Sequence, residues 1–593
     1  MGFEMRGIRD SGRALRDSGK LSMTQKRFLP FWWRVVLQAA VLVLAAAWIY
    51  SPVYHGEFLW DDDILITENW MVQSESLGGL AAIWIEPDGM DYFPLTYTAL
   101  WIQWMMFGDD PTGYHITSIT LHALSGLLIW VLLAQLKLPG SWLAAVVFTV
   151  HPVCVESVAW ISEIKNTLSL PLFLLSCMFW VQQDDHQQPI IRERWYGSSL
   201  LAFLLALLAK PTMVGLPLLT LLYAWWKRQK ITRQDLWRML PMLFQAFALG
   251  LITVWYQHER AIGGETIPIG GPLSRMAVAG MAIIFYLVKI IWPVGLMPIY
   301  PQWSVQSVEV WQLLPWVGLA VVGWFSWRHR SSWGRHVIMA GGFFLLMVAP
   351  VLGFVDMAFM RISWVADHFL YLPMIGPLAG LAAWGSHWLA GHASRFRWAS
   401  RSLAIGTVGL LASLSFEAAS HWQSSHALWT YSLSVNKQAW PAWMAVGDKE
   451  HGRENLAAAY HCYSQAVLLR EEVSDTLHYR EAVMEILLKQ GEYSKALAVF
   501  DQFIENGLGV KSPSAKPAFD YRTVRTRALA EGLAEKLLLA GSDDEGLEIF
   551  YGSVLLRNGK KHQAKALFSR LVYQNPSCQP AQAGLAAASS GDE

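Results

Sequence analysis

Apolar residues gather along this chain in runs that are long enough to cross a lipid bilayer. A membrane-spanning helix needs about 17 to 25 predominantly apolar residues. The runs occupy residues 34–53, 115–136, 140–152, 165–182, 196–209, 211–226, 239–256, 310–327, 336–354, 369–390 and 402–419. Because only helices and closed barrels satisfy every backbone polar group inside a bilayer, we predict an all-α, polytopic membrane domain over residues 34–420 with about eleven transmembrane helices.

Basic residues predict which ends of these helices face the cytoplasm. They concentrate in residues 1–33 and in the connections at 192–194, 227–238, 328–335 and 395–401. Lys and Arg favour cytoplasmic loops, so we predict a cytoplasmic basic N-terminal segment, residues 1–33, followed by a signal anchor that is not cleaved. The outward-facing loops are then 54–114, 151–163, 257–309 and 355–368.

Residues 275–292 test this count, because they are also apolar enough to span. Counting them as a span would move the basic cluster at 328–335 to the outer face, against the charge rule. We therefore predict that they form an interfacial or re-entrant helix on the outer face, with Lys289 near the membrane surface.

The chain becomes polar and repetitive after about Phe416, and we predict a separate extracytoplasmic domain over residues 421–593. Gly491, Tyr493, Ala496 and Phe500 recur as Gly559, Lys561, Ala564 and Phe568, with 68 positions between the two glycines. That spacing is twice the tetratricopeptide period of 34 residues. Weaker copies lie at Ala530 and Ala534, and at Tyr460, Tyr463 and Ala466. An α-solenoid of such repeats offers a concave surface for peptides.

Composition and charge exclude several classes of protein. Hydrophobic residues make up 54% of the 593 residues and charged residues only 16%, so most of the chain must sit in lipid. Lys plus Arg and Asp plus Glu are both 46, which gives no case for nucleic-acid binding. The four cysteines lack CxxC spacing, which argues against a zinc site or a disulfide framework. No glycine-rich dinucleotide motif is present.

Acidic and basic side chains in the outward loops are the candidate chemistry. Asp61, Asp62 and Asp63 follow the first apolar run directly, and charge placed at a hydrocarbon boundary usually has a function. The substrate-binding candidates are His151, Glu163, Lys165, Lys210, Asp367 and His368, and Glu156 joins the acidic triplet as a catalytic candidate. A helix through 151–163 would place Glu156 and Glu163 roughly on one face. Together these groups could supply a base for a hydroxyl and cations for a phosphate.

Each of these residues also has a purely structural interpretation. The acidic triplet could cap an interfacial helix. His151, followed by Pro152, could simply end a span with its ring bonded to backbone. Lys165 and Lys210 could extend their ammonium groups to the lipid headgroups.

The motifs in their order and spacing resemble the C-type (GT-C) glycosyltransferase superfamily. Within it, the chain is similar to bacterial tetratricopeptide-repeat membrane proteins related to transmembrane and tetratricopeptide-repeat O-mannosyltransferases. The resemblance covers residues 34–460 and rests on Trp60-Asp61-Asp62, Tyr92-Phe93-Pro94-Leu95-Thr96, Gly113-Tyr114-His115, His151-Pro152-Val153, Glu156-Ser157-Val158-Ala159-Trp160-Ile161, Glu163, Lys165-Asn166, Lys210-Pro211, Ala366-Asp367-His368 and Tyr371-Leu372.

The resemblance implies a polyprenyl-phosphate-linked sugar as donor, a hydroxyl as acceptor and inversion at the anomeric carbon. It assigns the general base to Asp61 or Asp62 and a supporting acidic role to Glu156, while Lys165, Lys210 and His368 would hold the lipid phosphate. Ile164 departs from the Arg that relatives often carry at that position, and Asp63 adds a third carboxylate. No cofactor is assigned with certainty, and a divalent metal is an open alternative because superfamily members differ in this respect.

Two classes of function stay open at this point. The first is a glycosyltransferase of the bacterial cytoplasmic membrane that modifies Ser or Thr of exported proteins, with periplasmic repeats recruiting the acceptor. The alternative is a non-catalytic membrane-anchored scaffold whose repeats bind partner proteins. A transporter is a weaker third possibility, because few charges lie inside the predicted spans.

Overall fold

The computed structural model describes residues 31–86, 89, 91–186, 188–262, 267–391, 397–469, 482–508, 531–532, 535 and 545–589. These residues form helices joined by short 3-10 and π turns, and no strand occurs among them. Most of the predicted cytoplasmic segment, residues 1–30, and the repeat copy at Ala530 and Ala534 lie outside the described residues.

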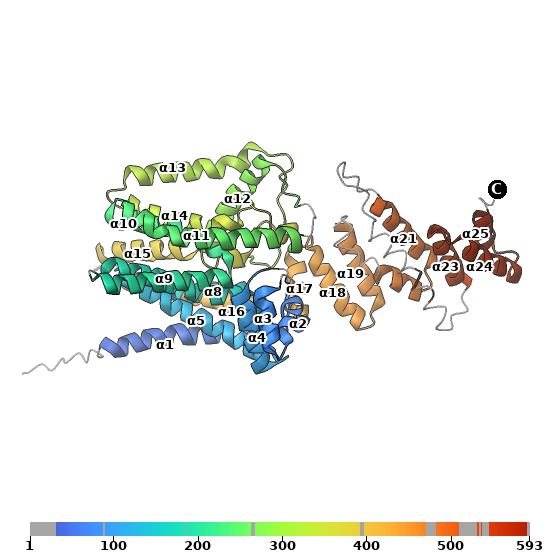
Figure 1. The fold of residues 1–593 in the computed structure, drawn as a ribbon, viewed down its shortest axis with the longest axis horizontal. Helices are drawn as coiled ribbons and strands as arrows, with labels where there is room; N and C mark the ends of the chain where they lie inside the picture. The colour runs from blue at the N-terminus through green and yellow to red at the C-terminus, as the bar shows by residue number, and fades with distance from the viewer. Residues whose placement is uncertain are drawn as a thin grey trace, which may run out of the picture.

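Each apolar run of the membrane domain contains a helix. In chain order these are α1 (Phe31–Ile49), α5 (Pro111–Gln135), α6 (Ser141–Thr149), α8 (Ile164–Asp185), α9 (Pro189–Ala209), α10 (Leu216–Arg228), α11 (Arg233–Tyr256), α13 (Leu314–Arg328), α14 (Gly334–Val348), α15 (Ile375–Gly391) and α16 (Arg397–Ser420). They run roughly alongside one another (Figure 1), and buried apolar side chains between them form the main hydrophobic core.

Eight helices of the described chain are long and apolar enough to cross a membrane, fewer than the eleven predicted. They are α1, α5, α8, α11, α12 (Pro272–Ile291), α13, α14 and α16. Helices α6 and α10 have only 9 and 13 residues, and a helix rises about 1.5 Å per residue. The chain is thus a multi-pass membrane protein, while about eleven crossings stay a prediction.

Proline marks where many of these helices begin. It occupies the first turn of α5, α9, α12 and α13. Proline has no N–H to lose at that position and its ring fixes the backbone near helical values. These helices of the bundle therefore begin at sharply defined positions.

The first outward segment, predicted as a loop, is largely helical. It contains α2 (Trp70–Gln73), α3 (Leu77–Ile85) and α4 (Pro94–Phe107), which share a separate core with the start of α5 and with the turn at Ile161 and Ile164. The Asn69 side chain accepts hydrogen bonds from the first free N–H groups of α2. A folded cap therefore covers the end of the bundle where the acidic triplet lies.

Helix α12 is tied at both ends to the same end of the bundle. Near its start, Arg275 donates to Gly353 O at 2.8 Å and to Asp356 at 2.7 Å, just beyond α14. At its other end, Ile290 O lies 3.0 Å from His151 Nε2, just beyond α6. These contacts favour the predicted interfacial placement, although the helix is itself long enough to span.

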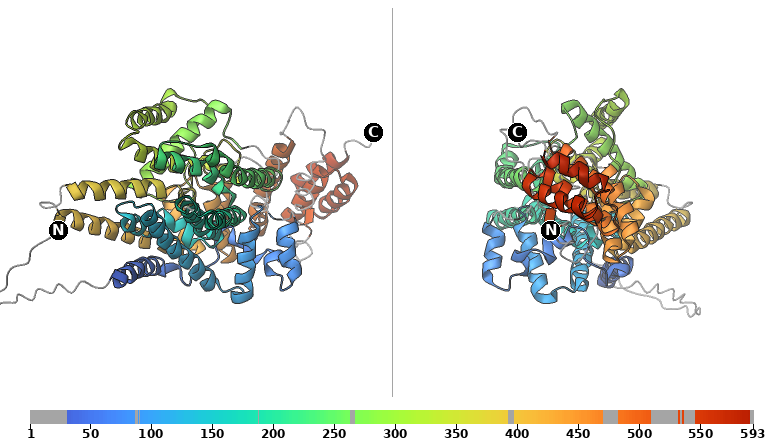
Figure 2. Two further views of the ribbon diagram at one scale, coloured as in Figure 1. Left: turned by 60° about the vertical axis from the view of Figure 1, so that its left-hand side comes forward. Right: turned by 90° about the vertical axis from the view of Figure 1, so that its right-hand side faces the viewer.

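The C-terminal helices extend away from that same end of the bundle, opposite the described start of α1 (Figures 1 and 2). They are α17 (Ser425–Val435), α18 (Trp440–Gly452), α19 (Leu456–Leu469), α21 (Tyr493–Leu508), α23 (Glu545–Arg557), α24 (Lys561–Gln574) and α25 (Gln579–Ser589). Gly491 and Gly559 precede α21 and α24 with φ values of +75° and +76°, a conformation that glycine adopts without strain at helix ends. The repeated Ala and Phe positions after them are buried, so this region is tetratricopeptide-like.

Cysteine labelling tests the placement of α12. In a chain whose four native cysteines are replaced, we expect Leu273→Cys and Trp292→Cys, both exposed positions at opposite ends of α12, to react with an impermeant maleimide from the same side of the membrane. The matched pair at the two ends of the candidate span that contains α13, Trp311→Cys and Trp327→Cys, should react from opposite sides. Reaction of the α12 pair from opposite sides would make α12 a span.

Candidate functional site

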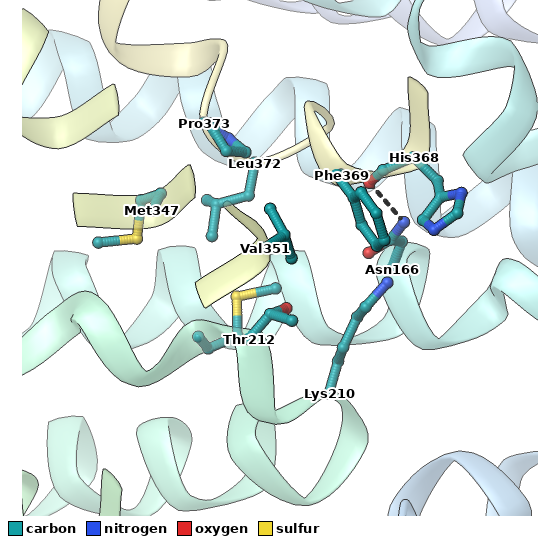
Figure 3. Close-up of a pocket in the computed structure, with 10 residues that line it drawn as sticks. Asn166, Lys210, Thr212, Met347, Val351, His368, Phe369, Leu372 and Pro373 are labelled. Atoms are coloured by element: carbon teal, nitrogen blue, oxygen red, sulfur yellow. Dashed lines mark hydrogen bonds between the residues drawn. The ribbon is translucent and has the colours of Figure 1, made fainter. Parts of the chain in front are cut away.

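Short turns at the capped end of the bundle bring charged side chains from distant parts of the chain together. They are the 3-10 turns η3 (Ile161–Glu163), η4 (Pro211–Gly215) and η9 (Asp367–Phe369), and each adjoins a helix of the bundle. Lys210 ends α9 in an extended conformation, because Pro211 follows it. The break lets the Lys210 side chain point toward Asn166 and His368 (Figure 3).

The Glu163 carboxylate joins two lysines. Its Oε1 lies 2.9 Å from Lys165 Nζ, and its Oε2 lies 3.2 Å from Lys210 Nζ. Asn166 Nδ2 donates to Oε2 at 2.7 Å. Glu163 is 1% exposed, and a buried charge is stable only when it is paired and hydrogen-bonded. Two of the predicted phosphate-binding cations are thus held side by side by a third predicted residue.

His368 links Glu156 to this group. Its backbone N–H and its ring Nδ1 contact the two oxygens of Glu156 at 3.0 and 2.9 Å, and its Nε2 lies 3.9 Å from Glu163 Oε1. The two glutamates do not share a helix face as predicted. Helix α7 (Cys154–Ala159) ends at Trp160, whose backbone is extended, and the residues meet through His368 instead.

Asp62 links the first two predicted outward-facing segments, residues 54–114 (the first outer loop) and residues 151–163 (the second outer loop). Its Oδ2 accepts from Leu59 N–H at 2.7 Å, and its Oδ1 accepts from Ser162 N–H at 2.7 Å and from the Ser162 hydroxyl. Burial raises the pKa of Asp62 to about 7, an effect that these hydrogen bonds partly offset. With its oxygens occupied by donors of the protein, Asp62 is suited to hold the loop in place.

Asp61 is the carboxylate of the triplet that is left available. Among the described residues its side chain makes no hydrogen bond or ion pair, and it is only partly buried. Burial raises its pKa, Lys165 opposes that effect, and Glu163 and Asp91 add to it. The charges that act on Asp61 therefore belong to the same cluster, and it can accept a proton from a substrate there.

Asp63, His151 and Asp367 have hydrogen-bond partners other than Glu163 and its two lysines. Asp63 is exposed and accepts from the Thr67 hydroxyl at 3.2 Å. Both ring nitrogens of His151 contact backbone, at Ile290 O and Val153 N, and burial lowers its pKa to about 4. Asp367 accepts from Tyr300 OH at 2.9 Å, and burial raises its pKa well above its usual value. The side chains of His151 and Asp367 thus already have partners within the protein, and their predicted substrate-binding roles stay predictions.

Two further polar residues join the site that were not predicted as members of it. Asn166 donates to Glu163, to Ser157 and to His368 O. Asp91 accepts from Gln257 Nε2 at 2.5 Å; burial raises its pKa, and Lys165 and Lys210 oppose that effect. Asn166 lies in a motif quoted above, but the role of Asp91 depends on the fold of the first outer loop and left no local signal.

A narrow cavity lies beside Lys210 (Figure 3). Its polar side is formed by Asn166, Lys210 and His368, and its apolar side includes Met347, Val351 and Leu372. Its free volume is about 10 Å³, close to what a single water molecule needs. Within the described part of the chain, no group of three or more His, Cys, Asp or Glu side chains is arranged to hold a metal ion.

The sequence of this chain is similar to those of known proteins. No family model matches the chain. It is 23% identical over 420 residues to human protein O-mannosyl-transferase TMTC3, which covers 63% of this chain and 44% of that protein. It is 29% identical over 171 residues to human protein O-mannosyl-transferase TMTC4, a match that covers 25% of this chain and 22% of that protein. The chain is a distant homologue of protein O-mannosyl-transferases. It spans less than half the length of these relatives.

A solved structure is also similar over much of the chain. The crystal structure of ArnT from Cupriavidus metallidurans in the apo state has 16% sequence identity and a TM-score of 0.33, with 85% of this chain and 80% of that chain covered. The likeness is too low to decide which residues of the two proteins correspond. The proposed function therefore rests on the sequence homology and on the cluster of charged residues around Glu163.

Stability measurements separate the roles of Asp61 and Asp62. We expect Asp62→Ala to lower the free energy of unfolding by about 2 kcal/mol or more, because it leaves buried donors at Leu59 and Ser162 unpaired. Asp61→Asn should leave stability unchanged or slightly raised, since it removes a partly buried charge that has no direct partner among the described residues. Unfolding of the full chain in detergent measures both. An equal loss in the two variants would contradict the assignment.

Proposed function

We propose that this chain is an inverting membrane glycosyltransferase that moves a sugar from a polyprenyl-phosphate donor to a hydroxyl, with Ser or Thr of exported proteins as the acceptor. The observation that carries the proposal is the pair of lysines on the buried Glu163 carboxylate, together with the available carboxylate of Asp61, on which Lys165 acts electrostatically. The homology to protein O-mannosyl-transferases supports the same reaction class.

The lysines suit the leaving group of this reaction. As the acceptor oxygen bonds to the anomeric carbon, the bond from that carbon to the phosphate oxygen breaks and its electron pair leaves with the phosphate. The phosphate gains a second negative charge, which Lys165 and Lys210 can stabilise in a site that excludes water. The apolar wall of the cavity at Met347, Val351 and Leu372 offers a surface for the first part of the polyprenyl chain.

Asp61 suits the other half of the reaction. A hydroxyl is a weak nucleophile, and a carboxylate that takes its proton in the transition state typically contributes about 10²–10⁴-fold. Asp61 is preferred to Asp62 because its oxygens are not occupied by donors of the protein. Asp91 shares the same charge environment and lies near enough to help orient the sugar or the acceptor.

A transfer assay tests the proposal. With the purified full chain, polyprenyl-phosphate-linked mannose and a Ser/Thr-rich peptide of an exported protein, we expect transfer with wild type and a kcat about 10²–10⁴-fold lower with Asp61→Asn. Lys210→Met should mainly raise the donor KM and lower kcat, because it removes a phosphate contact. Glu417→Gln, an exposed carboxylate on α16, is the matched control and should leave both values unchanged.

The result that overturns the proposal is equally specific. If Asp61→Asn, Asp62→Asn and Glu156→Gln each leave glycosylation of exported proteins unchanged, the catalytic assignment fails. The non-catalytic scaffold would then be the better description of the chain.

The pH dependence of transfer provides an independent test. The base must be ionised, so activity is present above the pKa of Asp61 in the folded site and is lost as pH falls through it. Burial raises that pKa, so we expect the acidic limb of kcat/KM to lie above the range of an ordinary aspartate. The phosphodiester of the donor stays ionised throughout. The residual activity of Asp61→Asn should lack this acidic limb. If the limb is unchanged, a group other than Asp61 produces it.

A further inference from the structure

A stack of tryptophans connects the C-terminal region to the loop that holds Asp61. The Trp60 ring lies parallel to the Trp160 ring, with centroids 4.8 Å apart and an interplanar angle of 10°. The edge of Trp429, from α17, meets Trp60 at 5.0 Å and 67°. Trp60 is therefore held between the second outer loop on one side and the first helix of the C-terminal region on the other.

Trp60 has an unusual backbone conformation. Its φ is +54°, one of four positive values among described residues other than glycine. A bulky side chain in this region is strained and persists only where surrounding contacts enforce it. The peptide that leaves Trp60 leads directly to Asp61, so the same backbone twist sets the direction of the Asp61 side chain.

The neighbouring residues are fixed independently of α17. Trp160 Nε1 donates to Leu59 O at 3.2 Å, and Asp62 accepts from Leu59 and Ser162. Trp60 and Asp61 lie between these anchors without a side-chain hydrogen bond among the described residues. What holds this step of the chain is the packing of the Trp60 ring.

Helix α17 is rigidly placed against the membrane domain. Gln423 O accepts from Glu57 N–H at 3.0 Å, and the Glu57 carboxylate accepts from Ser425 N–H at 3.1 Å. Further along, Tyr431 OH donates to Leu296 O at 2.8 Å, and Asn436 Nδ2 donates to Ile299 O at 2.9 Å. These hydrogen bonds hold α17, and with it Trp429, against the membrane domain.

We propose that Trp429 is a positioning residue for Asp61, acting through Trp60, so that α17 of the C-terminal region completes the site of the membrane domain. This inference rests on the proposed transferase function and on the role of Asp61 in it. Without the Trp429 ring, Trp60 can return to negative φ, and that change turns Asp61 away from Lys165 and Glu163. The Asp62 carboxylate and the lysines keep their partners, since none of these contacts involves α17.

The first experiment compares variants in the transfer assay. We expect Trp429→Leu to lower kcat by about 10²-fold with little change in the donor KM, and Trp429→Phe, which keeps an aromatic edge, to restore most of the activity. Trp443→Leu, a tryptophan on α18 that bonds to Lys437 O, is the matched control and should behave as wild type.

A double-mutant cycle tests whether Trp429 acts on Asp61 through Trp60. Glycine adopts positive φ without cost, so in a Trp60→Gly background the loss of Trp429 should have a much smaller effect than in wild type. If Trp429→Leu lowers kcat equally in both backgrounds, or no more than Trp443→Leu does, the positioning role is wrong.

Hydrogen exchange keeps this inference separate from the proposed function. Exchange of the Asp62 and Leu65 amides, which donate to Leu59 O and Asp61 O, should be at least about tenfold faster in Trp429→Leu than in Trp443→Leu. If wild type shows no transfer but exchange responds in this way, the reaction is wrong and the coupling holds. If exchange is unchanged, the coupling fails whatever the reaction is.

Discussion

The Glu163 carboxylate is the interaction on which the rest of the site depends. Two ammonium groups and an amide converge on it in a part of the protein almost without access to water. Neither lysine could remain there alone, because an unpaired buried charge is far too costly. The arrangement therefore holds two cations together in a largely buried part of the protein.

Local breaks in the helices make this convergence feasible. Trp160 interrupts the helix that would otherwise run from Cys154 into α8, and Pro211 does the same after α9. Each break leaves one or two side chains free to contact residues from a distant part of the chain. The hydrogen bonds of Asp62 and the stacked ring of Trp160 then fasten the first outer loop over these breaks.

The sequence pattern predicted much of this architecture, but only where its signals are local. Apolar length located the helices of the bundle, and the paired glycines before Tyr493 and Lys561 located the helix turns of the repeat region. The pattern also identified Glu163, Lys165, Lys210, Glu156 and His368, which the structure brings together. It could not assign separate roles to Asp61 and Asp62, because those roles depend on hydrogen bonds that Ser162, 100 positions away, donates to Asp62. It missed Asp91 and the helices around it for the same reason, and the roles it gave His151 and Asp367 stay predictions.

The small cavity beside Lys210 has a consequence for how such a site operates. Its free volume is about 10 Å³, whereas a sugar phosphate with the start of a polyprenyl chain is many times larger. The cavity as described is therefore too small for such a donor, and binding of the proposed donor here would require the apolar wall from α14 and η9 to separate from the turn after Lys210. Methionines at positions 213 and 347 line this contact, and their unbranched side chains can repack at low cost. In energetic terms the incoming phosphate exchanges one anionic partner of the lysines for another, so the main work of binding is to open the protein.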